Sequence, residues 1–273
     1  MTKLFLTDLD HTFLRNDLSI SSYSLNTWNN MSKKHIMSIA TARSYKKSEQ
    51  FLKGLNTNAP MILLDGSLIV SPEKKILDMK ILSQEIGNEI IECGKKLGIY
   101  PVVLSLKDKN LNEAFLYPKQ RNSYTNELIK RYHMDDNLQE SNNIKAMKEN
   151  FKIVYFSTKE QLQQLQENLH TVFKDEIKSI LAPEAYMGCY FLTILHKDAD
   201  KAHGLKTVHE LMQIDYKDFT VFGDNLNDMG MFELAKTSVA VSNAHEELKK
   251  IATYVSSYTN DEDAVAKYLQ TIG

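Results

Sequence analysis

Short apolar runs that alternate with amphipathic segments are the feature that most constrains how this chain can fold. The runs lie at 3–8, 35–40, 61–65, 219–224, 238–241 and 253–255. Runs of this length are typical of strands buried on both faces of a parallel sheet. The segments between them predict helices at 22–33, 44–53, 202–213, 245–251 and 262–270, with Ser44, Asp200 and Asn260 or Asp261 as N-caps. This order predicts an α/β fold with a doubly wound parallel sheet.

The middle of the chain has a different pattern. Its predicted elements are helices at 84–97, 123–133 and 159–170, strands at 100–105, 113–117, 151–156 and 177–181, and a polar stretch at 135–143. This mixture indicates a separate α+β unit that is inserted into the first domain. We therefore expect a core formed by 1–82 and 188–273, and a second domain at 83–187. Two crossings of the chain would join these domains, which would permit a hinge.

Composition excludes several classes of function. The chain has 273 residues, of which 42% are hydrophobic and 25% charged, as in soluble globular proteins, and its net charge of -2 gives no electrostatic basis for nucleic-acid binding. Its 2 cysteines form no CxxC pair, so neither a disulfide framework nor a thiolate zinc site is indicated. The first apolar run is too short for a signal peptide, and no stretch has the length of a membrane span. We expect a cytoplasmic protein, monomeric or weakly homo-oligomeric, with no nucleic-acid or membrane partner.

Four polar stretches lie at the ends of predicted core elements. They are "DLDHT" (8–12), "ATAR" (40–43), "DADKAHG" (198–204) and "FGDNLNDMGMF" (222–232). Three of them follow predicted strands, whereas "DADKAHG", which contains Lys201, lies at the start of a predicted helix. Ligands of open parallel sheets bind in the crevice outside the carboxyl ends of the strands. We therefore expect these stretches to converge on one site.

Such a convergence would gather the carboxylates of Asp8, Asp10, Asp224 and Asp228. These hard oxygen ligands would repel one another without a cation, and Mg²⁺ is the ion that they suit best. Taken alone, the first two aspartates are far more often a strand end followed by a helix cap than a catalytic pair. The similar group at the other end of the chain favours the metal site.

The same residues suit phosphoryl transfer. One aspartate can attack phosphorus, and a second one two residues later can protonate the leaving group and then deprotonate water. Thr41 would donate a hydrogen bond to the phosphoryl group, and Lys201 would add a fixed positive charge. In isolation, Thr41 would be a structural hydroxyl and Lys201 a solvated helix residue.

In order and spacing, "DLDHT", Thr41, Lys201 and "GDNLNDMGMF" resemble the four motifs of the haloacid dehalogenase superfamily of phosphatases. The insert and the C-terminal half are similar to its Cof-type sugar-phosphatase branch. The resemblance implies that Asp8 is the nucleophile and Asp10 the general acid/base, with Thr41 and Lys201 also catalytic. It implies metal ligands from Asp8, the Asp10 backbone carbonyl and Asp224, with Asp228 orienting metal-bound water. The substrate-binding residues that it implies are Thr41, Ala42, Arg43, Lys201 and Asn227.

Some positions depart from the family pattern. Ala42 and Ala264 replace common glycines, and Asp65 stands where asparagine is common. These changes affect loops near the substrate and remove no metal or proton-transfer group. In the insert, Glu184 and Tyr186 are candidates for contacts that recognise the leaving group. The alternative is that they belong to an ordinary connecting loop.

The sequence therefore predicts a Mg²⁺-dependent phosphatase that hydrolyses small phosphate monoesters through a phosphoaspartate. By resemblance, sugar phosphates are the expected substrates, and phosphorylated cofactors are an alternative class. The insert would act as a cap that closes over the site. Two other functions fit the same residues: a phosphotransferase or phosphomutase, and a non-catalytic protein that holds metal and ligand.

Overall fold

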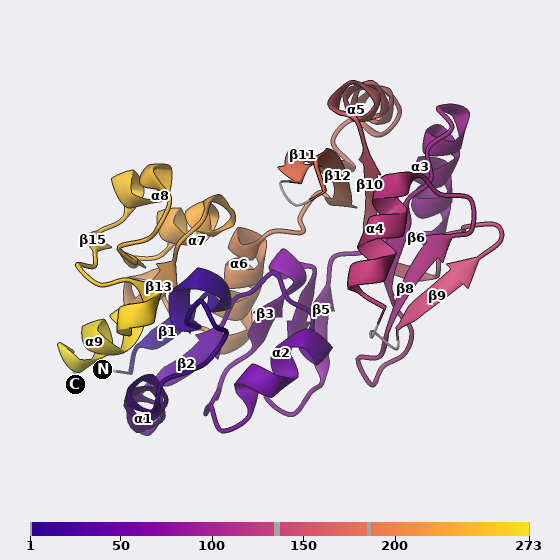
Figure 1. Cartoon of the computed structure of the whole chain (residues 1–273). Helices are drawn as coiled ribbons and strands as arrows, with labels where there is room; N and C mark the ends of the chain where they lie inside the picture. The colour runs from indigo at the N-terminus through magenta and orange to yellow at the C-terminus, as the bar shows by residue number, and fades with distance from the viewer. Residues whose placement is uncertain (1, 134–136, 185–186, 273) are drawn as a thin grey trace. The chain divides into compact units, whose positions relative to one another are not determined.

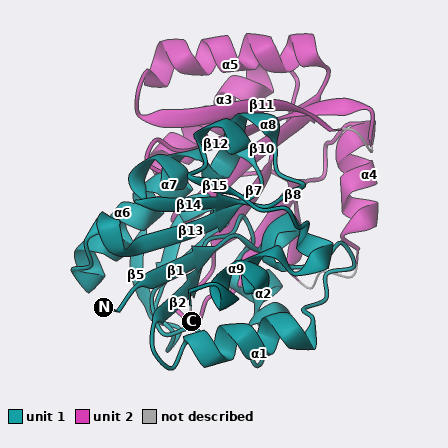
Figure 2. Ribbon diagram, turned by 90° about the vertical axis from the view of Figure 1, so that its left-hand side faces the viewer, with its two compact units in different colours: residues 1–79, 200–273 teal, residues 80–199 magenta. Residues whose placement is uncertain are grey.

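A computed structural model describes residues 2–133, 137–184 and 187–272. The chain divides into two compact units: unit 1 contains 1–79 and 200–273, and unit 2 contains 80–199 (Figures 1 and 2). Unit 2 is thus an insertion between the two halves of unit 1. Its end at Ala199 differs from the expected boundary at 187/188, because strand β12 (Cys189–His196) pairs with strands of unit 2.

A parallel sheet forms the centre of unit 1. Its strand order is β15-β14-β13-β1-β2. The strands are β1 (Leu4–Thr7), β2 (Ile36–Ile39), β13 (Phe219–Gly223), β14 (Thr237–Ala240) and β15 (Tyr254–Val255). All adjacent pairs in this order are parallel, as predicted. Thr7 at the end of β1 lies beside Ile39 of β2 and Phe222 of β13, so these three strands end at the same edge.

Helices cover both faces of this sheet. They are α1 (Ser22–Met31), α2 (Tyr45–Leu52), α6 (Lys201–Met212), α7 (Met229–Leu234), α8 (Glu246–Ile251) and α9 (Ala264–Gln270). Figure 2 shows α1 and α9 on one side of the sheet and α6 and α7 on the other. Leu4, Phe5 and Leu6 are all fully buried, as expected for a strand that is covered on both faces. The doubly wound α/β core is therefore confirmed.

A small antiparallel sheet extends unit 1 beyond β2. It contains β3 (Met61–Leu63), β4 (Leu68–Val70) and β5 (Ile76–Met79). A parallel bridge between Ala40 and Ile62 joins it to the end of β2. The sequence predicted only its first strand, because β4 is very short and β5 has no strongly buried face.

Two of the predicted helix caps are confirmed. Ser44 accepts a hydrogen bond from the backbone N–H of Lys47, and Asp200 accepts one from His203. The prediction of Asn260 or Asp261 as the cap of the last helix is wrong, because α9 begins only after Asp263. The Asn260 side chain instead donates to the Leu14 carbonyl, at 2.9 Å.

Unit 2 is an α+β unit. Its sheet has the strand order β11-β12-β10-β7-β8-β9, with β6 also paired to β10. The strands are β6 (Leu82–Ser83), β7 (Val102–Leu106), β8 (Glu113–Pro118), β9 (Leu138–Ser141), β10 (Glu149–Ser157), β11 (Ile177–Glu184) and β12. The helices are α3 (Gln84–Lys96), α4 (Ser123–Arg131) and α5 (Lys159–Phe173). The sequence missed β6, β9 and β12. Part of the predicted polar stretch, 134–136, lies outside the described residues.

The core of unit 2 lies where α3 and α5 pack on the sheet. It contains Ile90, Ile153, Leu165, Leu169 and Leu192, all essentially buried.

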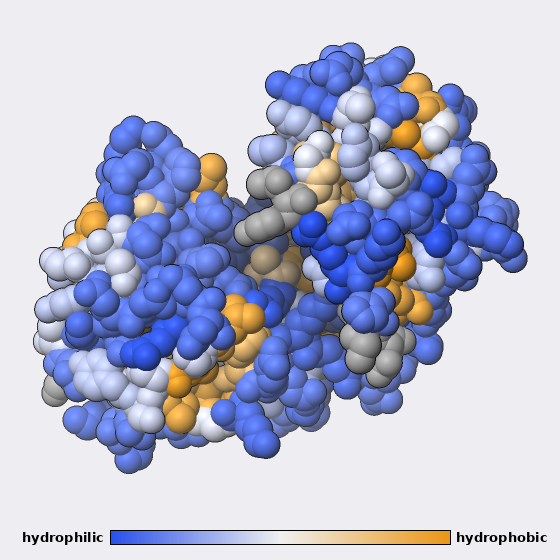
Figure 3. Space-filling model, viewed as in Figure 1, coloured by the Kyte–Doolittle hydropathy of each residue, from blue (hydrophilic) through white to orange (hydrophobic). Residues whose placement is uncertain are grey.

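On the face of the molecule drawn in Figure 3, side chains are mainly hydrophilic, and apolar ones form separate patches. Within the described residues, none of the helices has both the length and the apolar character needed to cross a membrane.

Candidate active site

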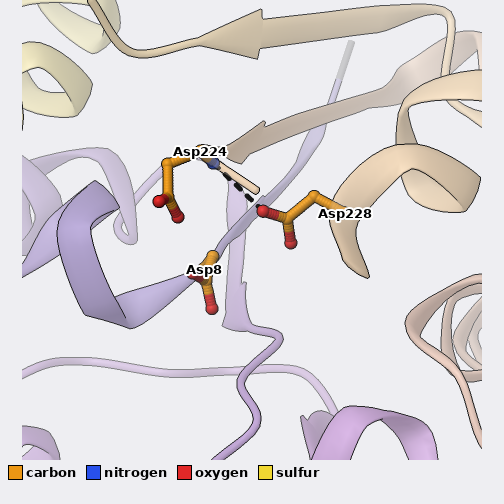
Figure 4. A group of neighbouring side chains, drawn as sticks. All are labelled: Asp8, Asp224 and Asp228. Carbon is orange, nitrogen blue, oxygen red and sulfur yellow. Dashed lines mark hydrogen bonds between the residues drawn. The ribbon is translucent and has the colours of Figure 1, made fainter. Parts of the chain in front are cut away.

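Three carboxylates meet at the carboxyl end of the parallel sheet (Figure 4). Asp8 follows β1 and Asp224 follows the adjacent strand β13, and the Asp8 N–H donates to the Phe222 carbonyl at 3.0 Å. Asp228 lies in the helical turn after Asp224. One oxygen of each carboxylate lies within 4.8 Å of an oxygen of the other two. The predicted convergence of residues from both ends of the chain is therefore present.

Backbone amides hold Asp228 in place. Its Oδ2 accepts hydrogen bonds from the N–H groups of Asp224 (3.0 Å) and Asn225 (3.1 Å). This close approach requires glycine at position 223, since a Cβ there would lie 2.5 Å from Asp228 Oδ2. The "GDNLND" segment thus folds around a single carboxylate, which leaves the other oxygen free to face Asp8 and Lys201.

Lys201 lies between two of these carboxylates. Its Nζ donates to Asp8 Oδ1 at 2.8 Å and to Asp228 Oδ1 at 2.7 Å. The lysine is the first residue of α6 and has no solvent exposure, so the alternative of a solvated helix residue is wrong. Burial alone would lower its pKa, but the Asp228 and Asp8 carboxylates outweigh that effect and raise the pKa above its ordinary value. Lys201 is therefore protonated at neutral pH.

The single lysine does not compensate the negative charge of the group. Burial raises the pKa of Asp8 well above its ordinary value; Lys201 opposes this shift, and Asp228 adds to it. Burial and Asp228 also raise the pKa of Asp224, whose Oδ1 accepts a hydrogen bond from the Thr12 hydroxyl at 3.0 Å. An excess of buried carboxylate oxygens is the donor set that a hard divalent cation prefers. The three carboxylates can therefore hold a metal ion.

Asp10 and Arg43 form an ion pair beside this group. Arg43 Nε and Nη2 donate to the two oxygens of the Asp10 carboxylate, at 2.7 and 2.5 Å. The guanidinium also lies over the Phe51 ring, 4.8 Å from its centroid. Sequence reasoning placed Arg43 among substrate-binding residues, whereas the structure shows its contact with the second aspartate of the motif.

Thr41 and Ala42 lie at the carboxyl end of β2, next to β1 in the sheet. Thr41 is fully buried, and its hydroxyl accepts a hydrogen bond from the Arg43 N–H at 3.1 Å. Ala42 is exposed to solvent. Within the described residues, no hydrogen bond joins Thr41 to the three carboxylates, so its predicted contact with a phosphoryl group stays a prediction.

A sharp turn at 64–66 connects Thr41 to the acidic loop. The Asp65 N–H donates to the Thr41 carbonyl, and Asp65 Oδ1 accepts from Asn227 Nδ2 at 2.9 Å. Gly66 has a φ of +90°, and a Cβ there would lie 2.0 Å from the Asp200 carbonyl oxygen. The turn therefore packs directly against the start of α6, where Lys201 lies.

Two residues of unit 2 were candidates for reading the leaving group. Glu184, the last residue of β11, accepts a hydrogen bond at its Oε2 from the Met187 N–H at 2.6 Å, which is a local contact. Tyr186 lies outside the described residues.

Sequence reasoning gave no role to Thr12, although its position four residues after Asp8 in the first motif was a usable signal.

Comparison with known proteins shows the family to which the chain belongs. A family model described as haloacid dehalogenase-like hydrolase matches residues 5–269. The chain belongs to this hydrolase family. A 5-amino-6-(5-phospho-D-ribitylamino)uracil phosphatase from Bacillus subtilis is 23% identical over 98% of this chain and 96% of its own length. A putative phosphatase from Mycoplasma pneumoniae is 40% identical, but the matching 81 residues span only 29% of that relative.

Several solved structures have the same fold as this chain. A protein from Thermotoga maritima has a TM-score of 0.81 and 26% identity, covering 100% of this chain and 98% of its own. A sugar phosphatase of subclass IIB of the superfamily has a TM-score of 0.72 and 19% identity, covering 100% and 99%. The family expected from the motifs is thereby confirmed by the family model, and the solved structures show the same fold.

Proposed function

We propose that this hydrolase is a Mg²⁺-dependent phosphatase that cleaves small phosphate monoesters through a phosphoaspartate on Asp8. The observation that carries the proposal is the group of Asp8, Asp224 and Asp228 at one site, where the buried Lys201 ammonium donates to Asp8 and Asp228. A nucleophilic carboxylate, a fixed cation and further hard oxygen ligands are the parts that phosphoryl transfer requires. The names of the relatives agree with this class of reaction.

In the first step, a carboxylate oxygen of Asp8 attacks phosphorus, and the bond from phosphorus to the leaving oxygen breaks. Asp10 gives its proton to that leaving alkoxide. In the second step, Asp10 takes a proton from a water molecule as the water attacks the phosphoaspartate, which releases phosphate and restores Asp8. Arg43 donates one hydrogen bond to each oxygen of Asp10, and each oxygen keeps a second lone pair that can hold or accept the transferred proton.

The other residues have supporting roles in this proposal. The metal ligands are the Asp8 carboxylate, the Asp10 backbone carbonyl and Asp224, with Asp228 orienting coordinated water. When bound, Mg²⁺ supplies positive charge against the phosphoryl oxygens and the carboxylates. Lys201 neutralises charge on Asp8 and on the phosphoryl group. The proposed phosphoryl and substrate contacts are Thr41, Ala42, Arg43, Lys201 and Asn227.

Small phosphorylated metabolites, and sugar phosphates first among them, are the proposed substrates. This class is supported by the phosphoribityl substrate named for one relative and by the sugar phosphatase with the same fold. We also propose that unit 2 acts as a cap that excludes water during the reaction. Its insertion between the two halves of unit 1 is the feature that supports this role.

Replacing the nucleophile tests the proposal. Asp8→Asn should reduce hydrolysis of an aryl phosphate by at least about 10³-fold, because an amide oxygen cannot form the acyl phosphate. The variant should keep the wild-type circular dichroism spectrum. A chelator should abolish wild-type activity, and added Mg²⁺ should restore it. Turnover by folded Asp8→Asn near the wild-type rate, or turnover that ignores the chelator, would refute the assignment.

A further inference from the structure

Hydrogen bonds from asparagine side chains hold the loop that follows β1. Asn243 Nδ2 donates to the His11 carbonyl at 2.8 Å. Asn260, which is nearly fully buried, donates from its Nδ2 to the Leu14 carbonyl at 2.9 Å and to Asn16 Oδ1 at 3.1 Å. Two segments near the C-terminus therefore bind the backbone that carries Asp8 and Asp10.

The loop needs such support because its backbone is unusual. His11 has a φ of +55°, a left-handed conformation that non-glycine residues adopt only when their surroundings enforce it. Asp10 immediately before it has an extended conformation, with a ψ of 131°. This change of direction within one turn sets the orientation of the Asp10 carbonyl, and the Asn243 contact acts directly on the next carbonyl.

The orientation of the Asn243 amide is itself fixed. The backbone N–H of Asn260 donates to Asn243 Oδ1 at 2.9 Å. Because the oxygen is occupied by this donor, the NH₂ group is the part of the amide that faces the His11 carbonyl. A carboxylate or an apolar side chain at this position cannot make both contacts.

The segment that contains Asn243 also contacts the second acidic loop. The His245 N–H donates to the Asp224 carbonyl at 2.7 Å, and the Val241 N–H donates to Gly223 at 3.3 Å. On the loop after β1, Thr12 donates to the Asp224 carboxylate. The segment 241–245 therefore donates hydrogen bonds to both loops that bring carboxylates to the site.

We propose that Asn243, oriented by Asn260, is a positioning residue for the metal site. By holding the His11 carbonyl, it fixes the backbone at 10–12, so that the Asp10 carbonyl and the Thr12 hydroxyl face the carboxylates. This inference rests on the proposed function, since it concerns the same metal site. It assigns no contact with metal or substrate to Asn243 itself.

Mg²⁺ binding by the full-length protein, measured by calorimetry with the metal alone, tests this role. Asn243→Ala should weaken Mg²⁺ binding by about five- to tenfold, because the loop loses its support while all metal ligands remain. Asn260→Ala should cause a smaller change in the same direction, and it serves as the second variant if Asn243→Ala does not fold.

Asn58→Ala is the matched control. Asn58 makes equivalent bonds at the amino end of β2: it accepts from the Met37 N–H and donates to the carbonyls of Ser32 and His35. This variant should melt at a lower temperature than the wild type yet bind Mg²⁺ with wild-type affinity.

The outcomes separate the two proposals. Weaker Mg²⁺ binding in Asn243→Ala, with wild-type binding in Asn58→Ala, supports the positioning role. Wild-type Mg²⁺ affinity in folded Asn243→Ala, or an equal loss in the control, overturns it and leaves the proposed function intact. A wild-type protein that binds no Mg²⁺ overturns the proposed function itself.

Discussion

At the scale of single residues, the site is defined by buried charges that are only partly compensated. Lys201 gives one positive charge to Asp8 and Asp228, and Asp224 receives a neutral hydroxyl from Thr12. Burial of an uncompensated carboxylate is costly, and here the cost appears as raised pKa values for Asp8 and Asp224. Such a group gains stability when a divalent cation binds it.

Gly223 is a residue whose lack of a side chain is required at the site. In Gly223→Ala, the new Cβ would lie 2.5 Å from Asp228 Oδ2 and displace that carboxylate from Lys201. We expect a loss of about 1–3 kcal/mol in the free energy of unfolding and a fall of about tenfold or more in kcat/KM. Urea denaturation and steady-state kinetics with an aryl phosphate measure these two quantities.

Gly204→Ala is the control for this change. Its Cβ would lie 2.5 Å from Ile62 Cγ2, where α6 packs on β3, and its three nearest neighbours would all be side-chain carbons of Ile62. A similar loss of stability is expected, with activity retained by the folded protein. Equal activity in the two variants would show that Gly223 has only a packing role.

At the scale of secondary-structure elements, Asp263 joins the first turns of α1 and α9. Its Oδ1 accepts hydrogen bonds from the hydroxyls of Ser21 (2.7 Å) and Ser24 (3.0 Å), and its Oδ2 pairs with Arg15 (2.8 Å). Burial raises the pKa of Asp263, but the bonds from Ser21 and Arg15 outweigh that effect, so the pKa lies below its ordinary value. The charged form therefore stabilises the contact between the two helices.

Asp263→Asn should lower the free energy of unfolding by about 1 kcal/mol at neutral pH, because it removes the charge that pairs with Arg15. The loss is no larger because Arg15 is partly exposed and solvent screens the pair. The hydroxyls of Ser21 and Ser24 can still donate to the amide oxygen. The pKa of Asp263 is lower in the folded protein than in the unfolded chain. The difference in free energy of unfolding between the wild type and the variant is therefore complete above the ordinary pKa of an aspartate, and it is lost as the pH falls below about 4. Urea denaturation at neutral and acid pH measures this difference in free energy of unfolding. A difference that is independent of pH would contradict this account.

At the scale of the whole molecule, the parallel sheet and the meeting of Asp8 with Asp224 were predictable from sequence. Apolar runs report burial on both faces, and parallel neighbours place their carboxyl ends at one edge. The end of unit 2 was not predictable, because "CYFLTILH" has the apolar content of a core strand, and only its pairing with β10 and β11 assigns it to the other sheet.

The contacts of loop residues also could not be predicted from the sequence. The pairing of Arg43 with Asp10 and of Asn243 with His11 depends on turn conformations such as the left-handed φ of His11. No periodic pattern encodes these conformations, since each is set by packing between segments far apart in the chain. Residue types at motif positions thus predicted which carboxylates meet, and they did not predict the hydrogen bonds that arrange them.

The central claim is that one carboxylate, on Asp8, carries the phosphoryl group during turnover. Acid quenching of the reaction with a labelled phosphate ester, followed by mass spectrometry of the peptides, tests it most directly. The account predicts one added phosphoryl group on the peptide containing Asp8, more of it in Asp10→Asn, and none in Asp8→Asn. Wild-type turnover with the phosphoryl group on another residue, or with no covalent adduct in either the wild type or Asp10→Asn, would contradict it.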